Sequence, residues 1–216
     1  MFLHILYLAC LFCSVVVGFY SLKHLPSRKL YFFPFYLLAV FGQELALSVT
    51  VFMHPSFSTG IFYNIYNPVN TLFFVWFYQQ IPFNRQGRKI TAILLVIFLT
   101  TVIYTFCFLQ SLQVYNNYLS LAGGFLITLS GILFLFNYFK LDNPALEKLW
   151  LPVLWITIGL VTFYPVVNIS FALYKYLLTY EATLFGHKLY RVLPQLMSIF
   201  MYVCFARAFY LCRKRN

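Results

Sequence analysis

One acidic side chain, Glu44, lies deep within a long apolar segment of the chain, residues 30–52. If this segment is a helix, Glu44 lies about fourteen residues, or roughly 21 Å, from its start. An ionisable side chain at that depth in a bilayer costs at least about 2.5–3.5 kcal/mol, and such residues mark ligand, ion or proton sites. We therefore favour a functional role for Glu44. The simpler alternative is a carboxyl that only hydrogen-bonds two helices together.

Seven further polar residues are expected near Glu44, because counting along antiparallel helices places them at a similar depth. They are Gln43, Asn67, Asn70, Tyr164, Asn168, Gln195 and Arg191, the last as a candidate cation partner of Glu44. Together they predict a polar cavity that opens to the outside of the membrane and admits a small molecule. The alternative is hydrogen bonding between neighbouring helices, at about 0.6–2 kcal/mol per bond. Asn64 belongs to the same stripe, since Asn64, Asn67 and Asn70 are spaced by three.

The composition shows that these segments need a membrane around them. The 216 residues are 62% hydrophobic, 22% aromatic and 9% charged, whereas a soluble domain has about 25% charged residues. Too few polar side chains remain to cover a soluble fold of this length. This excludes a soluble enzyme, a secreted domain and a disordered chain. The net charge of +11 comes from short basic clusters between apolar runs, so we expect no nucleic-acid partner.

Seven apolar runs are each long enough to cross a bilayer core of about 30 Å as a helix. They cover residues 1–20, 30–52, 61–80, 90–109, 118–139, 149–173 and 188–211. Helices are expected because lipid offers the backbone no hydrogen-bond partner, and because the runs lack the alternating polarity of barrel strands. No loop is long enough to fold alone. The sequence therefore predicts one all-α domain over residues 1–216, a bundle of seven transmembrane helices.

The distribution of basic residues predicts the orientation of the bundle. With seven spans, twelve of the fifteen Lys and Arg residues fall on one side of the membrane, and Lys175, Lys188 and Arg191 fall on the other. Loops rich in Lys and Arg remain in the cytoplasm. We therefore expect the N-terminus outside and the C-terminus in the cytoplasm.

Two other patterns concern how the helices pack. Small residues on the fifth run predict close contact with a neighbouring helix; they are Ser120, Gly123, Gly124, Ser130 and Gly131. The segments Tyr66-Asn67-Pro68-Val69-Asn70 and Tyr164-Pro165-Val166-Val167-Asn168 look alike, and they lie in runs that would correspond in an inverted repeat of a transporter. The match is only five residues long, and chance is the simpler explanation.

The histidines and cysteines do not predict a metal or redox site. His4, His54 and His187 map to the outer surface without the spacing of helical ligands. The five cysteines lie in or at the ends of apolar runs, where cysteine behaves as a small hydrophobic residue. The late His-x-x-x-His pair of ceramidase-like membrane hydrolases does not occur in the chain. We expect no metal, no cofactor and no enzymatic activity.

Short motifs near the third run and at the C-terminus are similar to those of a known group. The third run opens with Asn64-Ile65-Tyr66 and continues with Leu72-Phe73-Phe74, and a basic tail follows Ala206-Arg207-Ala208-Phe209-Tyr210. In these features the chain resembles uncharacterised seven-helix integral membrane proteins of Bacteroidota. Those proteins often carry a Glu after Asn-Ile-Tyr, and Asn70 occupies that place here. The resemblance implies a bacterial inner (cytoplasmic) membrane and a sensory or accessory role beside a signalling partner.

Three functions fit these patterns. The first is a receptor-like or accessory module that binds a small molecule from the outside and passes the signal to a protein partner in the membrane or cytoplasm. The second is a small proton-coupled transporter that uses Glu44 as its coupling acid. The third is a structural subunit of a membrane complex without a ligand.

Overall fold

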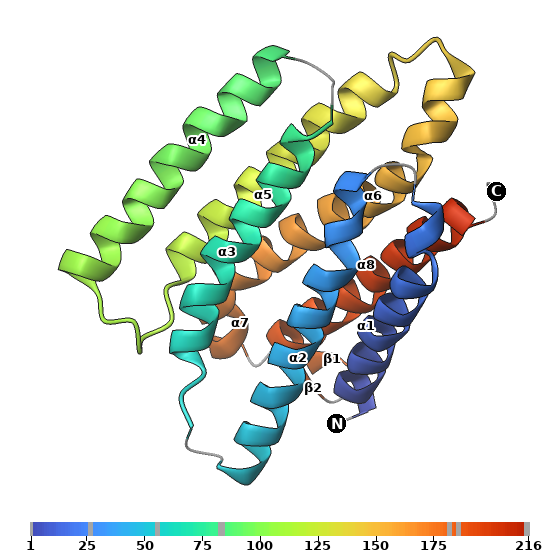
Figure 1. Ribbon diagram of the computed structural model, residues 1–216. Coiled ribbons are helices and arrows are strands. Elements are labelled where there is room, and N and C mark those ends of the chain that lie inside the picture. The colour runs from blue at the N-terminus through green and yellow to red at the C-terminus, as the bar shows by residue number, and fades with distance from the viewer. Residues whose placement is uncertain are drawn as a thin grey trace.

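The computed structural model describes residues 2–25, 28–54, 57–81, 85–180, 183–184 and 187–213. Seven long helices dominate it, and successive long helices run in opposite directions (Figure 1). They are α1 (Phe2–Tyr20), α2 (Phe32–Met53), α3 (Gly60–Gln79), α4 (Arg85–Tyr104), α5 (Asn117–Tyr138), α6 (Pro144–Ala172) and α8 (Leu189–Arg213). The predicted all-α bundle of seven helices is confirmed.

The remaining elements are short and lie in the connections between the long helices. Two 3-10 turns (Leu22–His24 and Arg28–Tyr31) join α1 to α2, and α4 ends in a π-helical turn, Thr105–Leu109. The short helix α7 (Tyr174–Thr179) and the antiparallel pair β1 (Thr183–Leu184) and β2 (His187–Lys188) connect α6 to α8. From the sequence, only a loop was expected between the last two apolar runs, because elements this short show no periodic pattern of hydrophobic residues.

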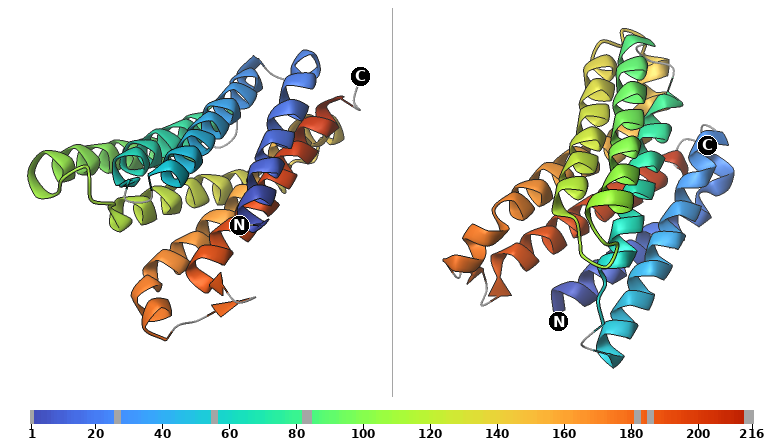
Figure 2. Two further views of the ribbon diagram at one scale, coloured as in Figure 1. Left: turned by 90° about the horizontal axis from the view of Figure 1, so that it is seen from below. Right: turned by 90° about the vertical axis from the view of Figure 1, so that its left-hand side faces the viewer.

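Six of the long helices are long and apolar enough to cross a membrane: α1, α2, α4, α5, α6 and α8. Helix α3 has the length, 20 residues, but it carries three asparagines and three tyrosines, which lower its hydropathy. It belongs to the same bundle, since it packs against α5 and α4 (Figures 1 and 2). The other close pairs are α6 with α8 and α5, α1 with α8 and α2, and α4 with α5.

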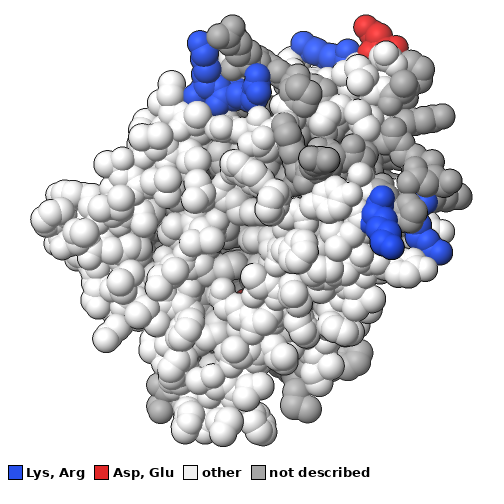
Figure 3. Space-filling model, in the orientation of Figure 1, with Lys and Arg blue, Asp and Glu red and all other residues white. Residues whose placement is uncertain are grey.

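The described basic side chains gather at one end of the bundle, which we call the charged end. They lie where α1, α5 and α8 end and where α4 begins, and they are Lys23, Arg88, Lys89, Lys140, Arg207 and Arg213. Figure 3 shows blue side chains at the top and right edges of the visible face and none across its centre. Among the described basic residues Lys188 alone lies toward the other end, where the N-terminus lies. This distribution agrees with the predicted clusters, while the compartment that each end faces stays a prediction.

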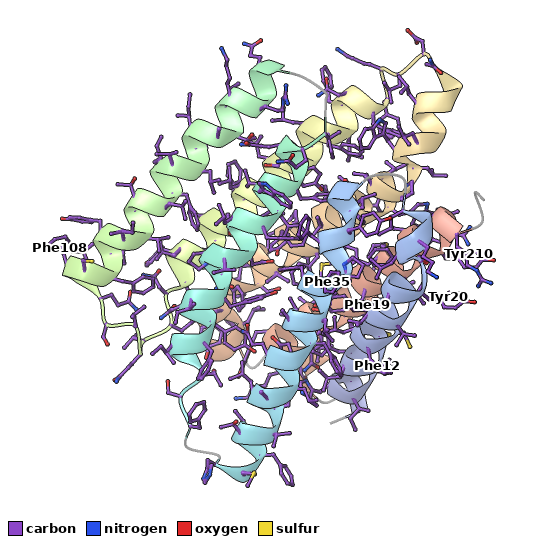
Figure 4. All side chains as sticks on the ribbon, viewed as in Figure 1. Phe12, Phe19, Tyr20, Phe35, Phe108 and Tyr210 are labelled. Atoms are coloured by element: carbon purple, nitrogen blue, oxygen red, sulfur yellow. The ribbon has the colours of Figure 1, made fainter. Side chains whose placement is uncertain are left out.

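The outer surface of the bundle is apolar, as a lipid-facing surface must be. Large side chains such as Phe12, Phe35 and Phe108 are more than half exposed, and Figure 4 shows Phe108 pointing away from the bundle at the end of α4. Helix α4 carries the clearest stripe, with Ile93, Val96, Ile97 and Ile103 all more than half exposed. Among the described residues, the surface between the ends of the helices is therefore largely apolar.

An aromatic cluster around Phe33 fills the centre of the bundle toward the charged end. The ring of Phe33 is fully buried, and it packs against Phe74 and Phe77 of α3 and against Phe205 and Phe209 of α8. Its nearest ring is that of Phe205, with 5.1 Å between centroids. These contacts tie α2 to α3 and α8 on the charged side of the molecule.

Gly131 allows α5 to approach α6, and its replacement by alanine is expected to weaken the bundle. A Cβ atom at Gly131 would lie 2.6 Å from Cγ2 of Val161, so the helices would have to move apart. Such overpacking lowers the free energy of unfolding by about 1–3 kcal/mol. Denaturation of Gly131→Ala in detergent measures this loss. The matched control is Gly42→Ala, where a Cβ meets nothing within 4 Å; equal stabilities of the two variants would contradict the close contact.

Candidate functional site

A cavity of about 400 Å³ lies inside the bundle. Its wall is built from α1, α2, α3, α5, α6 and α8, with Tyr115 from the segment before α5. Six of the eight residues singled out from the sequence line it; they are Glu44, Asn67, Asn70, Tyr164, Asn168 and Gln195. All six come from the halves of their helices that lie away from the charged end, or from near the middle. The chain therefore brings these separate polar residues to one place.

Glu44 is held in the cavity wall by neutral hydrogen-bond donors. The hydroxyl of Tyr63 donates to its Oε1 at 3.4 Å, and the Tyr7 hydroxyl lies within hydrogen-bonding reach of the same carboxyl. One turn along α2, Ser48 Oγ donates to the backbone carbonyl of Glu44 at 2.6 Å and also contacts His4 Nε2 at 2.9 Å. None of the described Lys or Arg side chains forms a salt bridge with Glu44. Its carboxyl therefore depends on tyrosine hydroxyls within the described part of the chain.

Asn70 connects three helices through its amide. Its Oδ1 accepts a hydrogen bond from the Tyr36 hydroxyl on α2, and its Nδ2 donates to the Tyr164 hydroxyl on α6 at 2.5 Å. The Tyr36 hydroxyl also lies 3.4 Å from that of Tyr66. Because both ends of the Asn70 amide have partners, this residue fixes the cavity wall in position. The hydrogen bond between Asn70 and Tyr164 also joins the two look-alike segments of α3 and α6.

The other predicted amides lie along the same wall with looser contacts. Asn168 Nδ2 donates to the Leu121 carbonyl of α5 at 3.2 Å, and Asn67 Nδ2 donates to the Tyr115 hydroxyl at 3.4 Å. Gln195 contributes from the start of α8. These three side chains retain donors or acceptors that a ligand in the cavity could use.

Two predicted site residues, Gln43 and Arg191, are not among the described residues that line the cavity. Gln43 is not part of the wall, because a residue next to Glu44 is turned by about 100° around the helix axis. Its Nε2 atom is buried and has no hydrogen-bond partner. The side chain of Arg191 lies outside the described residues, so its pairing with Glu44 stays a prediction.

Asn64 shares the asparagine stripe of α3 but has a different task. Its Nδ2 donates to the carbonyls of Leu112 and Val114, both at 2.8 Å, and its Oδ1 accepts from the backbone N–H of Asn116 at 3.0 Å. Asn116 in turn caps α5 by accepting from the Leu119 N–H at 3.0 Å. Asn64 therefore fastens the segment that begins α5, and it does not line the cavity.

The main component that sequence reasoning missed is a set of buried tyrosines. Six that line the cavity were not among the predicted residues: Tyr7, Tyr36, Tyr63, Tyr66, Tyr115 and Tyr202. Tyrosine in a membrane protein usually marks the ends of spans, where its ring lies at the interface. The missed signal is the position of Tyr202 well inside its helix, and the spacing of Tyr63 and Tyr66 beside the asparagines.

The cavity wall offers no set of metal ligands within the described residues. No three His, Cys, Asp or Glu side chains of that part of the chain come together. Toward the charged end, the wall residues Phe74 and Phe205 pack directly against Phe33. The aromatic cluster therefore forms a floor under the cavity, and the polar residues lie above it.

The arrangement can hold a small molecule between one carboxyl, several amides and many rings, with packed phenylalanine rings on one side. Such a concave, mostly apolar site with a few convergent polar groups is typical of ligand pockets. Comparison of the chain with models of protein families, with curated proteins and with solved structures finds no match.

Proposed function

We propose that this integral membrane protein binds a small molecule in the cavity and acts as a receptor-like or accessory module for a protein partner. The observation that carries the proposal is the convergence of Glu44, Asn67, Asn70, Tyr164, Asn168 and Gln195 on one cavity of about 400 Å³. The described residues form one helical bundle, so a bound ligand would act on a partner by favouring one arrangement of the helices. The resemblance to Bacteroidota proteins supports a bacterial inner membrane as its location.

The floor around Phe33 favours binding over passage. The cavity is flanked toward the charged end by a fully buried ring that contacts α3 and α8. A molecule that enters from the N-terminal end therefore meets the packed rings of Phe74, Phe205 and Phe33 at that side of the cavity. In the predicted orientation, with the N-terminus outside, this is a pocket that faces outward.

A proton-coupled transporter is the second candidate, and one contact favours it. The look-alike segments of α3 and α6 both line the cavity, and Asn70 of one is hydrogen-bonded to Tyr164 of the other. Each segment contains a proline, Pro68 or Pro165, which removes a backbone hydrogen bond and lets a helix bend. Glu44 in the same wall would then carry the proton. Uptake of a bound compound into proteoliposomes, driven by a pH gradient, would distinguish this function from a receptor.

Filling the cavity is expected to abolish ligand binding without unfolding the bundle. Val167 lines the cavity, whereas Ile169 on the same helix is 59% exposed on the outer surface. We expect small amines, neutral amides or small carboxylates to include compounds that raise the unfolding temperature of the wild type and of Ile169→Trp, because a ligand of the folded state stabilises it. The same compounds should have no effect on Val167→Trp.

A second substitution that fills the cavity keeps the test usable if Val167→Trp folds poorly. Ser120→Phe adds a ring from α5, at another part of the cavity wall. If no compound of the three classes stabilises the wild type, or if all variants respond equally, the protein does not use this cavity for binding. A structural subunit would then be the better description.

A further inference from the structure

The carboxyl of Glu44 is a negative group that the described part of the chain leaves without a positive partner. Its contacts are the neutral hydroxyls of Tyr63 and Tyr7. The one described imidazole nearby, on His4, has its recorded hydrogen bond with Ser48 Oγ and not with Glu44. A carboxylate removed from water needs a cation or must stay neutral. The cavity therefore presents a place where a bound positive charge would be stabilised.

The rings around the carboxyl add a second attraction for the same charge. Tyr63 and Tyr115 form one edge-to-face pair at 6.4 Å, and Tyr7 and Tyr202 form another pair at 5.8 Å. All four tyrosines line the cavity. The face of an aromatic ring attracts a cation, and cages of aromatic residues are used to recognise quaternary ammonium groups. Rings from α1, α3, α8 and the segment before α5 thus surround the end of the cavity that contains Glu44.

The volume of the cavity and the residues of its wall limit the class of ligand further. A volume of about 400 Å³ lies in the range of pockets for small organic molecules, about 300–1,000 Å³. A divalent metal ion does not fit, because no three acidic, His or Cys side chains of the described residues come together. The wall gives an anion little support, because no described Lys or Arg lines the cavity and the lining imidazole of His4 contacts Ser48 Oγ. A neutral molecule would leave the Glu44 carboxyl without a positive partner.

We propose that the ligand is a small monovalent organic cation with an aromatic or other apolar body, bound with its ammonium group against Glu44 and its body against the phenylalanine floor. This rests on the proposed function, since it names the class of molecule that the same cavity binds. The apolar body lies toward Phe74 and Phe205, and the amides of Asn168 and Gln195 accept or donate to polar substituents.

Titration of the purified full-length protein with benzyltrimethylammonium tests the proposal. The comparison probes are phenylacetate, an anion, and N,N-dimethylphenylacetamide, a neutral amide of similar size. We expect the cation alone to bind the wild type measurably by calorimetry. Glu44→Gln keeps the shape of the side chain but removes the charge, and it should weaken binding roughly thirty-fold or more. The matched control is Asp142→Asn, an exposed acid near the charged end, which should bind like the wild type.

Each other outcome overturns the proposal in a recognisable way. If the neutral amide binds as well as the cation, and Val167→Trp blocks it, the cavity is a ligand site but its ligand is not a cation. If Arg191 neutralises Glu44, the cation binds Arg191→Gln and not the wild type. If no probe and no compound of the wider set binds, the proposed function fails as well. The comparison of the three probes on the wild type remains decisive even if Glu44→Gln does not fold.

Discussion

Replacement of Phe33 by alanine is expected to lower the free energy of unfolding by about 3–5 kcal/mol, the range for a fully buried phenylalanine. Phe33 is 0% exposed and contacts rings of both α3 and α8. Its loss removes dispersion contacts on two sides, and such contacts drive helix association in lipid, where the hydrophobic effect between helices is weak. The gap that remains would also deepen the cavity toward the charged end.

Chemical denaturation of Phe33→Ala in detergent measures this effect, and Phe52→Ala is its control. Phe52 lies on the same helix, but it is 87% exposed, so its removal should change stability by less than about 1 kcal/mol. If the two variants lose the same stability, the aromatic cluster around Phe33 does not hold α2 in the bundle. The affinity of Phe33→Ala for an apolar ligand is a second measurement, and it should be lower than that of the wild type because the aromatic cluster below the cavity has lost a ring.

The positions of the helices could be predicted from hydropathy because the lipid imposes a nearly constant length on each span. The second run was expected at residues 30–52 and α2 covers Phe32–Met53; the fifth was expected at 118–139 and α5 covers Asn117–Tyr138. The starts of α4 and α6 are earlier than predicted, at Arg85 and Pro144 instead of 90 and 149. Hydropathy locates the apolar part of a helix, and a helix can continue into the polar interface. Proline is well placed in the first turn of α6, where no backbone donor is lost.

The depth of the polar residues could also be predicted, but their direction around each helix could not. Counting residues from the span ends places Glu44, Asn67 and Gln195 at comparable levels, and they line one cavity. Rotation about the helix axis depends on how neighbours pack, which a single sequence does not contain. For this reason Gln43 was expected beside Glu44 in the site and is not part of the wall. Except for Tyr164, the tyrosines of the wall were missed for the same reason, because a single sequence does not show which side of a helix faces the cavity.

The asparagines of α3 show most clearly what a single sequence cannot predict, since two residues of one stripe have different roles. Asn64 and Asn67 are one residue type, three positions apart on one helix. Asn64 is buried and satisfies three backbone groups of the segment before α5, whereas Asn67 lines the cavity and makes one long contact, 3.4 Å, with the Tyr115 hydroxyl. Spacing alone gives both residues the same role, and only the position of residues 112–116 against the start of α3 separates them.

Replacement of Asn64 by leucine is therefore expected to destabilise the fold, by about 2–4 kcal/mol, because a buried group that loses its hydrogen-bond partner costs about 1–3 kcal/mol. The N–H of Asn116 would lose its acceptor and the carbonyl of Leu112 would lose its donor, while the carbonyl of Val114 would keep only the Gln110 amide as a donor. The cap that Asn116 provides for α5 would be less well positioned as a result. Equilibrium unfolding in detergent measures the loss.

The matched substitution Asn67→Leu should separate stability from binding. Its free energy of unfolding should stay within about 1 kcal/mol of the wild type, because only one long side-chain contact is lost. The affinity for a compound that stabilises the wild type should fall, since leucine removes a donor and an acceptor from the cavity wall. Equal destabilisation by the two substitutions would mean that both asparagines hold the helices together. The cavity would then lose one of the polar groups on which its proposed function depends.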